Sequence, residues 1–169
     1  MSRLIGSKYN NDLYKNLIEG NIPSDLNDRI YIEAFGGSFG LCKILLKTYS
    51  PIQVIYNDIK VYNDKVILSP ANITYNLDYT KIFEKYNSEN SFFYLDPPYI
   101  GYEHYYEKTF ENGIDDHYKL FNEVQKLKGK WMLSYHDHPL LREWYNEYSF
   151  DSYIGKSMYH QKEIIIKNY

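Results

Sequence analysis

An aspartate, two prolines and a tyrosine, Asp96 to Tyr99, directly follow the apolar run Ser91–Leu95. An apolar run of this length predicts one buried strand. Proline has a fixed φ and no N–H, so the strand cannot continue past Asp96 and must give way to a rigid loop. In open α/β sheets, ligands bind beyond the C-terminal ends of the strands. The tetrapeptide is therefore a candidate for holding a flat amine, with Asp96 accepting hydrogen bonds and Tyr99 stacking on the ring.

The composition predicts one soluble domain. The chain has 169 residues, of which 44% are hydrophobic and 24% charged. This length suffices for one core but not for two. No apolar run approaches the roughly 20 residues that a membrane span needs, and the N-terminus lacks the apolar core of a signal peptide. The single cysteine, Cys42, fits a reducing, cytoplasmic environment.

The charge and the aromatic content bear on nucleic-acid binding. A net charge of −3 argues against a protein that grips DNA by bulk charge alone. We attribute the high number of tyrosines, 21, to a compositional bias of the genome. The functional alternative is that tyrosine rings stack on unpaired bases. Lys126, Lys128 and Lys130 precede a predicted strand and so lie at the end of the sheet away from the candidate site. We interpret them as a solvated helix end.

Strands and helices are predicted to alternate along the chain, which indicates an α/β fold. Strands are predicted at 29–33, 53–56, 72–75, 91–95, 131–135, 150–154 and 163–166. Helices are predicted at 9–19, 39–49, 60–68, 81–86, 115–127 and 139–148, and residues 100–116 are predicted to form a long loop. Such alternation implies a mostly parallel sheet with helices on both faces. The last two strands are too close for a crossover helix and should be antiparallel neighbours.

Polar clusters follow three of the predicted strands. Glu33 precedes Phe35-Gly36-Gly37, where glycines would let a ligand approach the backbone at the start of a helix. Asp58 follows Gly37 by 21 residues, near the spacing at which an acid can bond ribose hydroxyls. A glycine turn or a lone aspartate is a common structural feature. Their occurrence in this order, followed by Asp96 to Tyr99, predicts a nucleotide-type site.

At these residues the sequence resembles the Dam-like (D12 class) DNA adenine-N6 methyltransferases, which use S-adenosylmethionine. The resemblance rests on residues 5–8, 31–38, 56–59, 96–99, 133–135 and 163–169. It implies a Rossmann-like methyltransferase fold, with a mostly parallel sheet and an antiparallel C-terminal strand. It also implies catalytic roles for Asp96, Pro97, Pro98 and Tyr99. The residues that it implies for cofactor binding are Lys8, Glu33, Phe35, Gly36, Gly37, Asp58, Ile59 and Asp96.

The chain departs from the family pattern in three ways. The family usually has proline where this chain has Ala34, and glycine where it has Phe39. The larger side chain of Phe39 could crowd the cofactor loop. Only 37 residues separate Asp58 from Asp96, and the predicted strand and helices consume them. We therefore expect a single catalytic domain over residues 1–169, without a target-recognition domain. Recognition of a specific DNA sequence would then be weak, or would come from a second copy of the chain or a separate recognition subunit.

The resemblance implies transfer of a methyl group to the N6 amine of an adenine that has left the DNA duplex. Asp96 and the Pro97 carbonyl would accept from N6, and Tyr99 would stack on the base. The loop that follows is predicted to contact the nucleic acid, although a plain surface loop is the alternative. The residues predicted for nucleic-acid binding are Tyr99, Tyr102, His104, Tyr105 and Lys108.

Two other functions remain open. The same motif suits any planar amine, so the acceptor could be RNA or another amine. A non-catalytic subunit that binds nucleic acid or a partner is the second alternative. Phe39 and the short chain favour it, while Glu33, Asp58 and Asp96 speak against it. His136-Asp137-His138 is weak support for a metal site, and we predict instead a turn that begins a helix, with no metal.

Overall fold

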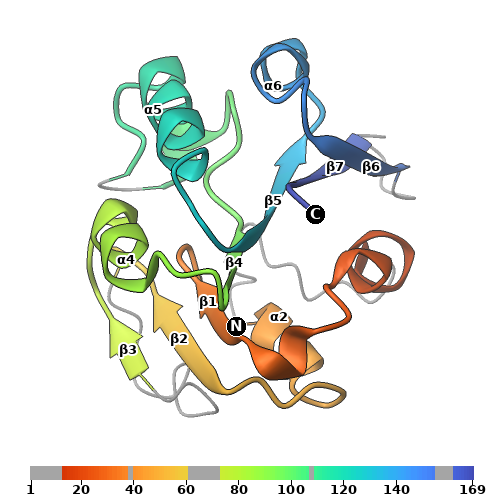
Figure 1. Cartoon of the computed structure of the whole chain (residues 1–169). Coiled ribbons are helices and arrows are strands. Elements are labelled where there is room, and N and C mark those ends of the chain that lie inside the picture. The colour runs from red at the N-terminus through yellow and green to blue at the C-terminus, as the bar shows by residue number, and fades with distance from the viewer. Residues whose placement is uncertain (1–12, 38–39, 61–72, 107–108, 155–161) are drawn as a thin grey trace, which may run out of the picture.

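The computed structural model describes residues 13–37, 40–60, 73–106, 109–154 and 162–169 (Figure 1). Its centre is a seven-stranded sheet in the order β3-β2-β1-β4-β5-β7-β6. The strands are β1 (Ile30–Glu33), β2 (Gln53–Asn57), β3 (Ile73–Tyr75), β4 (Ser91–Leu95), β5 (Lys130–His136), β6 (Ser149–Ile154) and β7 (Lys162–Lys167). Strands β1 to β5 pair in parallel, and β7 is antiparallel to both β5 and β6. The predicted mostly parallel sheet with an antiparallel C-terminal strand is confirmed.

Helices cover both faces of this sheet (Figure 1). The α-helices among the described residues are α2 (Gly40–Leu45), α4 (Tyr79–Tyr86), α5 (Ile114–Val124) and α6 (Pro139–Trp144). Shorter helical turns are η1 (Tyr14–Ile18), η2 (Glu19–Asn21), η3 (Leu26–Asp28) and η4 (Glu103–Tyr105). The predicted strands and most helices are present with shifted ends. The helix predicted at 60–68 falls almost wholly outside the described residues.

Three predicted helices, now α2, α5 and α6, end three or four residues early, and one changes type. The segment predicted as a helix at 9–19 is, in its described part, a π-helical turn followed by a 3₁₀ turn. The helical turns end at Asn21, whose side-chain amide donates to Leu17 O at 2.7 Å and to Asp151 Oδ2 at 2.9 Å. The bond to Asp151 is a tertiary contact, and such contacts can outweigh local helix propensity. Helices α2 and α6 tighten into turns after Leu45 and Trp144, where Thr48 N bonds Leu45 O and Tyr148 N bonds Tyr145 O.

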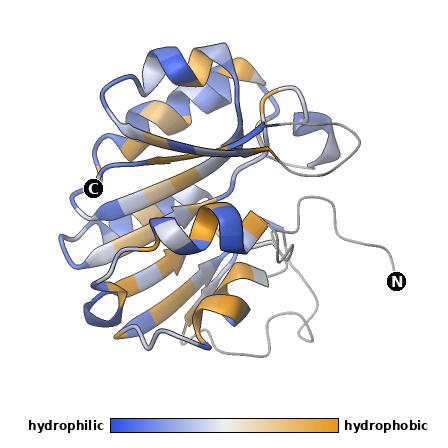
Figure 2. Ribbon diagram, turned by 90° about the vertical axis from the view of Figure 1, so that its right-hand side faces the viewer, coloured by the Kyte–Doolittle hydropathy of each residue, from blue (hydrophilic) through white to orange (hydrophobic). Residues whose placement is uncertain are grey.

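The central strands of the sheet are buried on both faces. Figure 2 shows hydrophobic residues along the strands and on the inward sides of the helices. One core cluster joins the strands to α4, α5 and α6, and the other joins them to α2 and the N-terminal turns. Phe93 and Leu95 of β4 belong to the first cluster, while Phe92 and Tyr94 belong to the second. This double burial is why β4 reads as a continuous apolar run.

The C-terminal ends of β1, β2, β4 and β5 form one edge of the sheet, which we call the carboxyl edge. Strand β1 lies between β2 and β4, so the strand order reverses at this point. In doubly wound sheets the ligand crevice lies at such a reversal, beyond the strand ends. Glu33, Asp58 and Asp96 are at, or directly after, the ends of β1, β2 and β4. The topology therefore brings the three predicted acids to the same edge.

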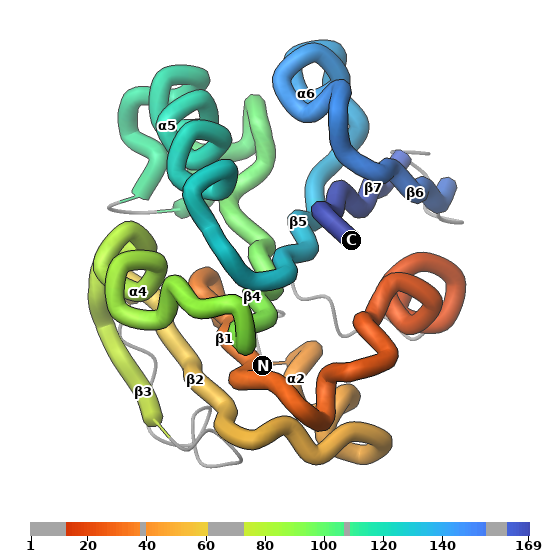
Figure 3. Tube along the Cα trace, in the orientation of Figure 1, coloured from red at the N-terminus to blue at the C-terminus, as the bar shows by residue number. Residues whose placement is uncertain are grey.

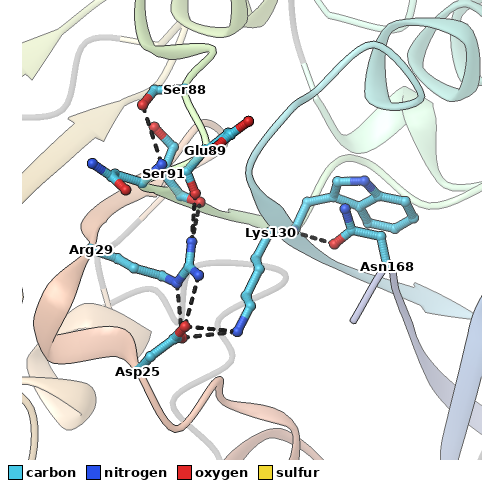
Figure 4. A network of polar contacts seen from close by, with 9 residues as sticks. Asp25, Arg29, Ser88, Glu89, Ser91, Lys130 and Asn168 are labelled. Atoms are coloured by element: carbon cyan, nitrogen blue, oxygen red, sulfur yellow. Dashed lines mark hydrogen bonds and ion pairs between the residues drawn. The ribbon is translucent and has the colours of Figure 1, made fainter.

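A polar network stabilises the opposite edge of the sheet (Figure 4). Asp25 accepts hydrogen bonds from Arg29 at 2.8 and 2.7 Å, and Lys130 Nζ donates to both of its carboxylate oxygens, at 3.0 and 2.9 Å. These bonds, from Arg29 first and then Lys130, hold the pKa of Asp25 well below its usual range. Lys126 pairs with Glu123 on the surface. Lys130 thus lies away from the carboxyl edge, as predicted. Among the described residues, no helix has the length and apolar content to cross a membrane.

Candidate active site at the carboxyl edge

The motif Asp96 to Tyr99 leaves β4 at the carboxyl edge with its two prolines buried and with Asp96 and Tyr99 half-buried. The Tyr99 hydroxyl donates to Glu163 Oε2 at 2.9 Å and lies 3.4 Å from Ser134 Oγ. Its ring meets the ring of His136 edge-on, with centroids 4.3 Å apart. Residues of β5 and β7 therefore set the orientation of the tyrosine in the motif.

Glu163 and His136 are members of the site for which the sequence analysis assigned no binding or catalytic role. They are partners in the antiparallel register of β5 and β7, and Glu163 Oε1 lies 3.3 Å from His136 Nε2. Glu163 is 64 positions from Tyr99 in the sequence. No local pattern reports such a contact, because it exists only once β7 has been added next to β5.

The glycine turn after β1 packs closely against β2. A Cβ on Gly36 would lie 2.2 Å from the Tyr56 ring, so no larger residue fits without moving that ring. Gly37 has a φ of +49°, which glycine adopts at little cost. Its N–H donates to Asp58 Oδ2 at 2.8 Å. The structure thus joins the predicted glycine turn to the predicted ribose acid directly.

The Asp58 carboxylate is held by backbone N–H groups, and the residue is half-buried. Besides Gly37, the N–H of Lys60 donates to Asp58 Oδ1 at 2.8 Å. Burial raises the pKa of Asp58, and these two backbone hydrogen bonds oppose the rise. A carboxylate has about four acceptor positions, so hydroxyl groups of a ligand can still donate to it. Ile59 beside it is 37% exposed and offers an apolar contact.

The other predicted cofactor residues are placed differently. Phe35 is half-buried and packs its ring against Tyr79 and Phe110, at 5.2 and 6.0 Å between centroids. Glu33 is 3% exposed and accepts a hydrogen bond of 2.6 Å from the Tyr31 hydroxyl. Burial, with the nearby charge of Asp96 adding to it, raises the pKa of Glu33 to about 8. This shift favours the protonated form of the buried Glu33 side chain at neutral pH, and the cofactor role of Glu33 stays a prediction.

The loop after Tyr99 carries a row of aromatic rings. Tyr102 contacts His136 edge-on at 5.4 Å and stacks on Tyr105 at 6.2 Å, and Tyr105 contacts His104 at 4.0 Å. Tyr105 is 52% exposed. The row leads outward from the Asp96–Tyr99 motif, and contact of these residues with nucleic acid stays a prediction. Lys8, Phe39 and Lys108 lie outside the described residues.

The His136-Asp137-His138 segment is occupied with structural contacts. Asp137 pairs with Arg142 at 2.8 Å and with Lys162 at 3.1 Å. His138 caps α6, because its Nδ1 accepts from Leu140 N at 3.2 Å. The predicted helix does begin directly after this segment, but His136 is the last residue of β5 rather than part of a turn. Within the ranges that the structure describes, no three histidine, cysteine or acidic residues gather as metal ligands.

The fold is similar to solved structures that include proteins described as methyltransferases. The Escherichia coli protein described as "Putative methyltransferase yhhF" aligns with a TM-score of 0.62 and 10% identity, over 98% of this chain and 90% of that chain. The B. subtilis tRNA methyltransferase TrmK aligns with a TM-score of 0.51 and 15% identity, over 98% and 67%. A Streptococcus thermophilus protein described as "Putative hemolysin" aligns with a TM-score of 0.59 and 11% identity, over 99% and 67%. At such identities the likeness shows the fold alone.

The strand order of the sheet and the similar solved structures define a Rossmann-like methyltransferase fold. The chain belongs to the D12 class N6 adenine-specific DNA methyltransferase family, whose model matches residues 62–161, more than half of the sequence. The matched segment contains Asp96 to Tyr99, while the glycine turn and Asp58 precede it. No curated protein sequence matches the chain.

Proposed function

We propose that the protein transfers a methyl group from S-adenosylmethionine to the N6 amine of an adenine that has left a DNA duplex. The observation that carries this proposal is the position of Asp96 to Tyr99, which leaves β4 where the strand order reverses. Family membership, with a match that includes this motif, supports the choice of adenine N6 in DNA.

The proposed chemistry rests on positioning. The N6 lone pair of adenine is delocalised into the ring and is a weak nucleophile. Hydrogen bonds from N6 to the Asp96 carboxylate and the Pro97 carbonyl would localise that lone pair and stabilise the positive charge that develops on nitrogen. Tyr99 would stack on the base, with its ring held by Glu163 and His136. The two prolines contribute rigidity and remove competing N–H donors.

The residues around β1 and β2 fit an adenosine-bearing cofactor. Asp58 presents an anchored and partly exposed carboxylate for the ribose hydroxyls. A Cβ on Gly37 would meet no described atom within 4 Å, so this side of the turn leaves room for a ligand, and Ile59 offers an apolar surface. When bound, S-adenosylmethionine supplies an electrophilic methyl group on a sulfonium.

Identifying the modified nucleoside tests the function directly. We expect the protein to move label from S-adenosylmethionine into unmethylated DNA, and digestion should yield N6-methyladenine. Parallel reactions contain RNA, because an RNA acceptor or a guanine product would replace this proposal with the planar-amine alternative. Absence of label from both nucleic acids, together with cofactor binding, would favour a non-catalytic role.

Asp58→Ala should weaken S-adenosylmethionine binding about 10- to 100-fold, because hydrogen bonds to a charged acceptor are lost. Isothermal titration calorimetry of the cofactor measures this change. Asp115→Ala is the matched control, since Asp115 is an exposed carboxylate on α5. Equal affinity in the Asp58 variant and the wild type would remove Asp58 from the cofactor site.

A further inference from the structure

A chain of hydrogen bonds, buried at its inner end, lies beneath the loop that follows the Asp96–Tyr99 motif. The loop winds in successive turns, with Tyr102 N donating to Tyr99 O at 2.9 Å and Tyr105 N donating to Tyr102 O at 3.1 Å. Figure 3 shows it leaving β4 toward α5. Within it, Glu103 points inward while its neighbours Tyr102 and His104 carry the aromatic row. The Glu103 side chain is only 18% exposed.

Glu103 Oε1 lies at one end of a series of hydrogen bonds that links Glu103, His117 and Tyr135. It accepts from Gly101 N at 3.0 Å and from His117 Nε2 at 2.9 Å. His117 is fully buried on α5, and its Nδ1 lies 2.7 Å from the Tyr135 hydroxyl on β5. A carboxylate only accepts, so Nε2 carries the proton, Nδ1 is the acceptor and Tyr135 donates. All of these polar groups are paired, so the chain has one consistent arrangement of protons.

This arrangement connects the loop to the motif. The ring of Tyr135 lies 5.6 Å from the ring of Tyr99, on which the base would stack. Burial lowers the pKa of His117, against the opposing effect of Glu103. Burial also disfavours ionisation of Glu103, but bonds from backbone N–H groups and His117 prevail and lower its pKa. These shifts favour an ionised Glu103 carboxylate that accepts a hydrogen bond from a neutral His117 imidazole.

The far end of the loop is held at the same histidine. Phe110 has a φ of +54° and is 5% exposed, a strained conformation for a bulky residue. Its ring packs on His117 at 4.6 Å and on Phe35 of the glycine turn at 6.0 Å. His117 thus supports both ends of the loop, and the loop touches the turn where the cofactor residues are predicted.

We propose that Glu103 and His117 are positioning residues, which hold residues 101–106 so that Tyr102 and Tyr105 are set for contact with nucleic acid. This inference rests on the proposed function for its ligand. The inference predicts a change in DNA affinity opposite in sign to the change that charge alone would cause. A carboxylate in a loop that meets a polyanion opposes binding by its charge, so its removal should strengthen binding if charge were its only effect. If positioning dominates, removal weakens binding instead.

The test compares three variants of the full chain. Glu103→Ala removes the charge and the hydrogen bonds, while Glu103→Gln removes the charge but keeps an acceptor for Gly101 and His117. Glu111→Ala removes an exposed charge from the same loop and is the matched control. Binding is measured with a labelled, adenine-containing DNA duplex. Amide hydrogen exchange of residues 101–106 reports the order of the loop without any activity.

We expect Glu103→Ala to weaken DNA binding about 10- to 100-fold and to raise loop exchange by a similar factor. S-adenosylmethionine affinity should stay unchanged. Glu103→Gln and Glu111→Ala should bind DNA as tightly as the wild type or more tightly. Unchanged exchange in Glu103→Ala would overturn the inference, as would tighter DNA binding by that variant. If the wild type neither binds nor methylates DNA, the proposed function fails, and the exchange data still decide whether Glu103 holds the loop.

Discussion

Replacing Asp96 by alanine should lower the rate of methyl transfer about 100- to 1000-fold while the protein still binds S-adenosylmethionine. The proposed role of Asp96 is to accept a hydrogen bond from N6 and to stabilise the charge that develops there. Such an interaction strengthens in the transition state, so its loss should lower kcat more than it raises KM. Single-turnover labelling of DNA, with a separate cofactor titration, separates the two effects.

Asp115→Ala again serves as the control, because it removes an exposed carboxylate from the surface of α5. We expect that variant to turn over at the wild-type rate. Undiminished transfer by Asp96→Ala would eliminate the proposed chemistry at this motif. A loss of transfer accompanied by an equal loss of cofactor affinity would assign Asp96 to cofactor binding instead.

The parts of the site that could be predicted from the sequence are those encoded within one strand–turn unit. The apolar run before Asp96 predicts β4, and the prolines predict where it ends. Glycines after β1 and the acid after β2 lie at the carboxyl edge because parallel strands end there together. In each case local chemistry and topology agree, so a short pattern suffices.

The remaining parts depend on contacts between distant segments. Glu163 and His136 reach Tyr99 through the antiparallel register of β7 with β5, which no local pattern encodes. Glu103 lies within residues 100–116, which have no hydrophobic period and are predicted to form a loop, and the structure adds the short turn η4 there. His117 lies in the helix predicted at 115–127, which the structure shows as α5. Polar residues that face inward from a loop carry no periodic signal, so their pairing emerges only in three dimensions.

Glu33→Gln should stabilise the protein at alkaline pH and have little effect in acid. The pKa of Glu33 is raised from 4.5 to about 8, chiefly by burial. The folded protein therefore binds more protons than the unfolded chain between these values, and its free energy of unfolding falls as the pH rises through that window. The slope is about 1.4 kcal/mol per pH unit, which amounts to about 3 kcal/mol at neutral pH.

Glutamine removes this term at small structural cost, since its carbonyl can accept one hydrogen bond and the Tyr31 hydroxyl can turn to accept from its amide. Urea unfolding at about pH 5 and about pH 8 should show stability curves that diverge with rising pH. Glu111→Gln, an exposed carboxylate, should follow the wild type throughout. Parallel curves for Glu33→Gln and the wild type would mean that Glu33 ionises normally. That result would restore a carboxylate beside Asp96 and, with it, the case for Glu33 as a ligand of a cationic cofactor.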